Sequence, residues 1–79
     1  MYLILTKDNC PYCTKAKALL ESLSLPYRTI ELHVDVTKQE AQELLGDIEL
    51  TTVPQVWCND EHVGGFESLC DWLIETGEV

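Results

Sequence analysis

Two stretches typical of strands, on either side of one helical segment, constrain the fold of the first 32 residues. "YLILT" (Tyr2–Thr6) is a continuous apolar run of strand length, typical of a buried strand that is covered on both faces. Pro11 suits the first turn of a helix, and apolar residues then recur at helical spacing until about Ser24, just before Pro26. "YRTIEL" (Tyr27–Leu32) alternates and is rich in strand-forming residues. The three segments predict a βαβ unit with parallel strands and a right-handed crossover.

The remaining sequence predicts a second helix, a hairpin and a last helix. Thr37 and Glu40 have the spacing of a capping box, so a helix should follow Thr37 and end at Gly46. Asn59-Asp60 separates "QVWC" from "EHVG", which is typical of a two-residue hairpin turn. The apolar face of the last helix, which should end near Gly77, is predicted at Phe66, Leu69, Cys70, Leu73 and Ile74.

These elements follow the order β-α-β-α-β-β-α and predict one α/β domain over residues 1–79. The simplest assembly is a four-stranded mixed sheet with helices on both faces. Its parallel strands come from the first half of the chain and its antiparallel hairpin from the second. The composition, 46% hydrophobic and 24% charged, is that of a globular protein rather than a disordered one.

The charge and the hydropathy of the chain exclude several classes of partner. With 14 acidic and 5 basic side chains the net charge is −9, so the basic face that a nucleic-acid binder needs is missing. No stretch approaches the roughly 18 apolar residues of a membrane span, and "MYLILTKDNC" does not resemble a secretory signal. We therefore expect a cytoplasmic protein whose cysteines meet a reducing environment.

The pair Cys10 and Cys13, in "CPYC" at the start of the first helix, has three possible roles. A structural disulfide would close a loop too short to remove much entropy from the unfolded chain. A zinc site would need two further ligands, and the candidates lack the usual close spacing: Cys58, Cys70, His33 and His62. A redox centre is the third possibility and is typical of CxxC within a βαβ unit.

The redox interpretation has a physical basis in the position of the first cysteine. At a strand-to-helix junction Cys10 lies beside free N–H groups and the positive end of the helix dipole, which favour the thiolate and lower the thiol pKa. Lys7 and, less directly, Lys15 add positive charge. We expect Cys10 to be exposed and to attack a disulfide, and Cys13 to resolve the mixed disulfide that results.

Two further motifs have both a structural and a functional interpretation. In "TVPQV" Pro54 is either an ordinary strand-start proline or follows a cis bond that turns the Val53 backbone outward, where an extended peptide pairs with it. In "GGFES" the glycines Gly64 and Gly65 either form a loose turn or let the backbone approach a ligand. The helix N-terminus that follows them would then hold a carboxylate, and Glu67 an ammonium group.

"CPYC", "TVPQV" and "GGFESL", in this order and spacing, resemble the dithiol glutaredoxins over essentially the whole chain. The resemblance implies a thioredoxin-like fold, glutathione as the reducing co-substrate and no metal. It implies that Cys10 is the nucleophile and Cys13 the resolving cysteine. The glutathione contacts that it implies are Lys7, Tyr12, Thr52, Val53, Pro54, Gly64, Gly65, Phe66 and Glu67.

Individual roles follow from the same resemblance. Lys7 corresponds to the lysine that pairs with the glycine carboxylate of glutathione, and Tyr12 to the aromatic residue that flanks the bound sulfur. Gln39 has a looser correspondence to a polar residue near that carboxylate. Where family members often carry two aspartates this chain has Glu67 and Ser68, so we expect weaker binding of the γ-glutamyl group.

The expected activity is glutathione-dependent reduction of protein disulfides and glutathione mixed disulfides by a monomer. The resemblance makes ribonucleotide reductase a plausible electron acceptor. One alternative is a glutaredoxin-shaped electron donor that thioredoxin reductase reduces, against which Lys7, Tyr12 and Glu67 argue. The other is an iron–sulfur carrier with glutathione as co-ligand, against which Pro11 and Cys13 argue.

Overall fold

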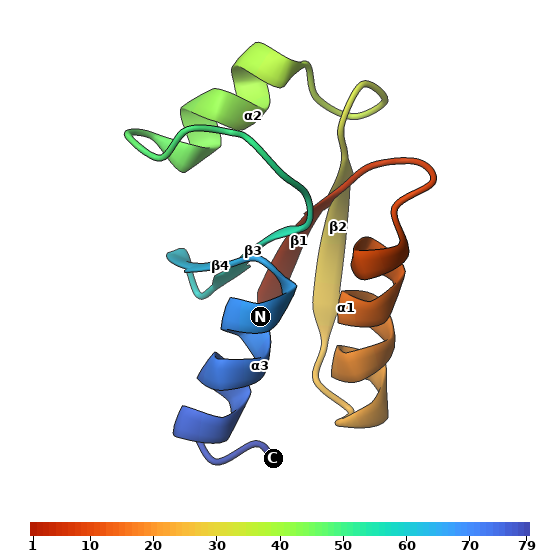
Figure 1. The fold of residues 1–79 in the computed structure, drawn as a ribbon, viewed down its shortest axis with the longest axis vertical. Helices are drawn as coiled ribbons and strands as arrows, with labels where there is room; N and C mark the ends of the chain where they lie inside the picture. The colour runs from red at the N-terminus through yellow and green to blue at the C-terminus, as the bar shows by residue number, and fades with distance from the viewer.

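The strand β1 (Tyr2–Thr6) is an inner strand of a four-stranded sheet in the computed structural model, which describes all 79 residues (Figure 1). The other elements are α1 (Pro11–Ser22), β2 (Tyr27–Glu31), α2 (Lys38–Leu45), β3 (Gln55–Cys58), β4 (Glu61–Gly64) and α3 (Phe66–Glu75). The strand order is β2-β1-β3-β4, with β1 parallel to β2 and antiparallel to β3, and β3 antiparallel to β4. The predicted element order and mixed sheet are confirmed.

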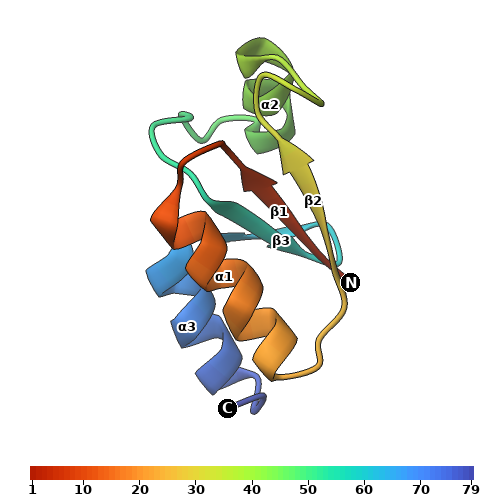
Figure 2. The same ribbon diagram turned by 90° about the vertical axis from the view of Figure 1, so that its right-hand side faces the viewer.

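Different helices cover the two faces of the sheet (Figure 2). On one face α1 and α3 enclose a core made of Tyr2, Ile4, Ala16, Leu20, Val56, Leu69 and Leu73. On the other face α2 packs on a smaller core made of Leu5, Leu32, Ala41, Leu45 and Trp57. The neighbours Ile4 and Leu5 are both fully buried but belong to opposite cores, which is why "YLILT" is apolar without alternation.

Short-range signals place the ends of the elements where they were predicted. The Thr37 hydroxyl accepts from the Glu40 N–H at 3.1 Å, and the Glu40 carboxylate accepts from the Thr37 N–H at 2.9 Å, which completes the capping box of α2. Gly46 ends that helix with a φ of 66°. Asn59 and Asp60 have φ values of 49° and 70°, as a tight two-residue hairpin requires.

The predicted apolar face of the last helix is too wide. Leu69 and Leu73 are fully buried, whereas Ile74 is 61% exposed and Cys70 is only half-buried. Residues four apart form one line along a helix, but the next residue along the chain turns about 100° away from that line. Cys70 and Ile74 each follow a core leucine by one position, so the prediction of a core role is wrong for Ile74 and half correct for Cys70.

None of the helices has the length and the apolar character that crossing a membrane requires. The longest, α1, has 12 residues.

Two tyrosines make the free energy of unfolding depend on pH in the alkaline range. The Tyr27 hydroxyl donates a hydrogen bond to Glu21, and this bond raises the pKa of Tyr27 above its ordinary value of 10.0. Burial likewise raises the pKa of Tyr2. Because the folded chain holds both protons more tightly than the unfolded chain, the stabilisation is complete below pH 10 and is lost as the pH rises through the folded-state pKa values.

We therefore expect the free energy of unfolding to fall above pH 10, and Tyr27→Phe to reduce the steepness of that fall. Urea denaturation at a series of pH values measures both curves. An equally steep fall in the variant would show that the bond to Glu21 does not contribute.

Candidate active site

The sulfur of Cys10 caps the N-terminus of α1. Asn9, with a φ of 56°, turns the chain out of the β1–α1 loop, and Cys10 then has the extended backbone of an N-cap residue. Its Sγ accepts a hydrogen bond from the Cys13 N–H at 3.1 Å, and Pro11 occupies the first helical position, where its missing N–H costs nothing. An N–H donor and a helix N-terminus both favour negative charge on this sulfur once it is reduced.

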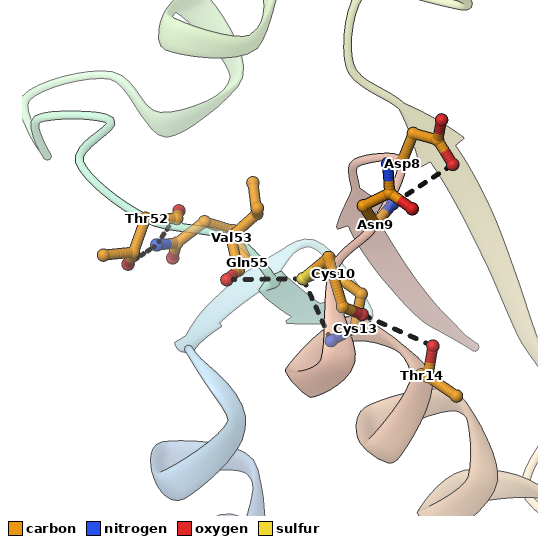
Figure 3. The surroundings of a disulfide bond; sticks show 8 residues. All are labelled: Asp8, Asn9, Cys10, Cys13, Thr14, Thr52, Val53 and Gln55. Atoms are coloured by element: carbon orange, nitrogen blue, oxygen red, sulfur yellow. Dashed lines mark hydrogen bonds between the residues drawn. A yellow bond between two sulfur atoms is a disulfide. The ribbon is translucent and has the colours of Figure 1, made fainter.

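Cys10 and Cys13 form a disulfide, with Cα atoms 5.2 Å apart (Figure 3). Cys13 is 1% exposed and lies beneath the first turn, whereas Cys10 is partly exposed. Only the outer sulfur is accessible to a disulfide on another molecule. This difference agrees with the predicted order of attack, Cys10 first and Cys13 second, which remains a prediction.

The segment Thr52–Pro54 lies across from the disulfide. The Val53–Pro54 peptide bond is cis, which is the second of the two possibilities for Pro54. The Val53 carbonyl oxygen lies 3.8 Å from Cys10 Sγ, and none of the backbone hydrogen bonds outside the helices and strands uses the Val53 N–H or C=O (Figure 3). The Val53 backbone is therefore free to pair with an extended chain next to the sulfur.

A groove of about 480 Å³ continues from this segment to the start of α3. Its lining residues are Tyr12, Thr52, Val53, Pro54, Gly65, Phe66, Glu67 and Ser68. The rings of Tyr12 and Phe66 lie 5.9 Å apart and form an aromatic wall, and Lys15 Nζ lies 4.9 Å from the centre of the Tyr12 ring. The groove thus brings together seven of the nine residues predicted to contact glutathione.

The other two of the nine, Lys7 and Gly64, do not line this groove, and neither does Gln39, whose correspondence was looser. Lys7 lines a separate depression of about 610 Å³ beside Cys10 and Cys13. Figure 3 shows its neighbours Asp8 and Asn9 on the opposite side of Cys10 from Val53. Gln39 lines a third depression together with other residues of α2. Lys7 is thus close to the sulfurs, while the structure does not bring Gln39 to them.

The two glycines of "GG" have different requirements. Gly64 has a φ of 123°, and a Cβ at this position would lie 2.8 Å from the side chain of Ser68. Gly65 has a φ of −85°, and its Cβ would lie at an ordinary 3.6 Å from the Pro54 carbonyl oxygen. Gly64 therefore lets α3 approach β4, while Gly65 begins α3 without a side-chain cap, which leaves the first N–H groups of α3 without a side-chain partner.

Comparison with known proteins decides the family. A glutaredoxin family model matches residues 3–63. Glutaredoxin 3 of Escherichia coli is 39% identical over 66 residues, which cover 84% of this chain and 77% of that protein. Glutaredoxin 1 of Escherichia coli is 32% identical, with 91% of each chain covered. The chain belongs to the glutaredoxin family.

Solved structures agree with this assignment. The structure of reduced Escherichia coli glutaredoxin matches with a TM-score of 0.83 at 30% identity, and the match covers 99% of this chain and 98% of that one. A buckwheat glutaredoxin solved as a complex with glutathione matches with a TM-score of 0.76 at 27% identity, over 98% and 70% of the two chains. Together with the Cys10–Cys13 disulfide, the family makes this glutaredoxin a thiol–disulfide oxidoreductase with a thioredoxin-like fold.

Sequence reasoning missed two features of the glutaredoxin site. Ser68 lines the groove, and its side chain occupies the space that a Cβ at Gly64 would need. The sequence indicates only that it lacks the charge of an aspartate. Gln55 begins the predicted strand "QVWC", and its side chain also donates to the Thr52 carbonyl, which nothing in the sequence indicates. His62, considered only as a zinc ligand, bonds Gln55 instead, and no three His, Cys, Asp or Glu side chains gather in an arrangement that would hold a metal ion.

Exchanging each glycine for alanine tests this division of roles. Gly64→Ala should lower the free energy of unfolding by about 3 kcal/mol, because it adds a strained backbone conformation to a steric clash with Ser68. Gly65→Ala should cost only about 1 kcal/mol, mostly from a poorer N-cap. Equal losses in thermal or urea denaturation would contradict the assignment.

Proposed function

We propose that this glutaredoxin is a glutathione-dependent oxidoreductase that reduces protein disulfides and glutathione mixed disulfides. The observation that carries the proposal is the position of the partly exposed Cys10 sulfur, 3.8 Å from the free carbonyl of Val53, at one end of the groove. A cysteinyl unit that pairs with the Val53 backbone would bring its own sulfur next to Cys10.

The groove offers complementary partners to each end of glutathione, a tripeptide of net charge −1. The N–H groups at the start of α3 are available to the γ-glutamyl carboxylate, and the exposed Glu67 to its ammonium group. Lys7, in the depression beside Cys10, is the cation that we assign to the glycine carboxylate, and Tyr12 and Phe66 shield the sulfur between them. The buckwheat relative that was solved with glutathione supports this choice of ligand.

The proposed reaction has two branches. The Cys10 thiolate attacks a substrate disulfide, forms a mixed disulfide and expels one substrate thiolate. With a protein disulfide, Cys13 then attacks the Cys10 sulfur, which expels the second substrate thiolate and forms the Cys10–Cys13 disulfide. With a glutathionylated protein, Cys10 takes the glutathione sulfur and the protein thiolate leaves. One further glutathione then attacks this mixed disulfide, which frees the Cys10 thiolate and releases oxidised glutathione. In the first branch, two glutathione molecules return the internal disulfide to the dithiol and leave as oxidised glutathione.

The setting of this reaction is part of the proposal. A dithiol cycle that glutathione drives needs a reducing pool, which favours a cytoplasmic location. The proposed acting form is a monomer. Family resemblance adds ribonucleotide reductase as a candidate acceptor of the electrons.

Single cysteine variants test the two branches in an assay that couples glutathione, glutathione reductase and NADPH. Cys10→Ser should abolish turnover of every substrate, because it removes the accessible sulfur. Cys13→Ser should keep the reduction of a glutathionylated peptide and lose the reduction of a protein disulfide. Residual turnover by Cys10→Ser would reassign the nucleophile, and equal losses by Cys13→Ser would refute the division of labour.

Lys7 and Lys17 line the same depression and form a matched pair for testing the glutathione carboxylate contact. Lys7→Ala should raise the KM for a glutathionylated peptide roughly fivefold, the effect of losing one charged hydrogen bond at a partly exposed site. Lys17→Ala, which removes the same charge, should change the KM less than twofold. Similar increases in the two variants would mean that only the general field of the lysines matters.

A further inference from the structure

We propose that His62 and Gln55 are positioning residues for the exchange reaction, because they hold the Thr52 carbonyl and thereby keep the Val53 backbone facing Cys10. The inference rests on the proposed function and names residues that none of its steps requires. It starts from an unbroken line of hydrogen bonds from β4 to the segment beside the disulfide.

The first link joins β3 to that segment. Gln55, the first residue of β3, is only 7% exposed, and its Nε2 donates to the Thr52 carbonyl at 3.0 Å and lies 3.5 Å from the Thr52 hydroxyl. Figure 3 shows this contact on the Val53 side of the site. No backbone hydrogen bond outside the helices and strands involves Thr52 or Val53, so the Gln55 side chain is the internal bond that fixes this stretch of backbone.

The second link fixes the orientation of the Gln55 amide. Its Oε1 lies 2.8 Å from His62 Nε2. An amide oxygen only accepts hydrogen bonds, so Nε2 of His62 must carry a proton. The reversed amide would place its oxygen 3.0 Å from the Thr52 carbonyl oxygen, and two acceptors cannot bond each other. The network therefore has one consistent direction, in which His62 donates to Gln55 and Gln55 donates to Thr52.

The third link anchors His62. In the hairpin His62 pairs with Trp57, and the two rings lie 5.5 Å apart in an edge arrangement. Trp57 is 8% exposed and belongs to the core beneath α2. The imidazole is thus held by a rigid indole on one side and bonds a buried amide on the other. The side chains of Trp57, His62 and Gln55 thus connect the smaller core, beneath α2, to the backbone next to Val53.

The consequence for catalysis follows from the distances at Cys10. The Val53 carbonyl lies 3.8 Å from Cys10 Sγ, and misplacement by about 1 Å in such a site can cost two orders of magnitude in rate. Releasing the Thr52 carbonyl would let Val53 move without touching either sulfur. Substrates that pair with the Val53 backbone would then suffer, and a disulfide without peptide groups would suffer less.

The variants His62→Leu and His62→Gln test this series of hydrogen bonds. Leucine removes the donor, whereas the glutamine amide nitrogen can occupy the position of Nε2. Reduced protein is mixed, in single turnovers without free glutathione, with either a glutathionylated peptide or 2-hydroxyethyl disulfide. We expect His62→Leu to lower the rate ratio, peptide over small disulfide, roughly tenfold, and His62→Gln to restore at least half of the wild-type ratio. Glu61→Gln, at an exposed neighbouring position, is the control for a change on β4.

An unchanged ratio in His62→Leu would overturn the inference, as would a loss that His62→Gln does not restore. If His62→Leu does not fold, nitrogen-15 NMR of the wild-type protein decides the matter. The inference requires a proton on Nε2 of His62 at neutral pH, and an unprotonated Nε2 would contradict it. Failure of the proposed function has a different signature, because the wild-type protein itself would then show no preference for the glutathionylated peptide.

Discussion

The hydrogen bond from the Cys13 N–H to Cys10 Sγ is the interaction on which the site depends. It gives the first turn of α1 the side-chain cap that Ser, Thr or Asp usually supplies, so helix formation and sulfur activation use the same contact. Pro11 keeps the turn in place between the two cysteines. Because Cys13 is buried and its N–H points at Cys10, the helix start also sets which sulfur faces solvent.

Strand pairing then brings the second half of the site to this sulfur. In the antiparallel pair β1–β3, Leu5 lies opposite Gln55. The end of β1, from which the chain continues to Cys10, lies beside the start of β3, which the chain enters from Val53. The βαβ unit and the hairpin unit contribute one motif each. A register shift of one residue would place the Gln55 side chain on the other face of the sheet.

Much of this arrangement is predictable from the sequence, because its signals are local. The capping box at Thr37, the Asn59-Asp60 turn and the placement of Cys10 at a helix start each depend on a few neighbouring residues, and the structure confirms all three. Tertiary neighbours decide the rest. How far the apolar face of α3 extends depends on what α1 and the sheet leave uncovered, so Ile74 was misjudged. The bonds of Gln55 join residues from two strands and a loop, and no periodicity in the sequence reveals them.

An acidic chain can still gather positive groups at one place. Lys7 and Lys17 line the depression beside Cys10, Lys15 lies 4.9 Å from the centre of the Tyr12 ring, and the backbone adds two helix N-termini. The helices α1 and α3 begin next to each other, as the 5.9 Å between the rings of Tyr12 and Phe66 shows, so both positive helix ends lie beside the groove. The first turn of α1 carries no acidic residue, and that of α3 carries only Glu67. Two aligned helix ends act over a few ångströms, whereas the net charge of −9 is spread over the whole surface and screened by salt. The local field at Cys10 therefore comes from the nearby helix ends and lysines rather than from the net charge of the whole chain.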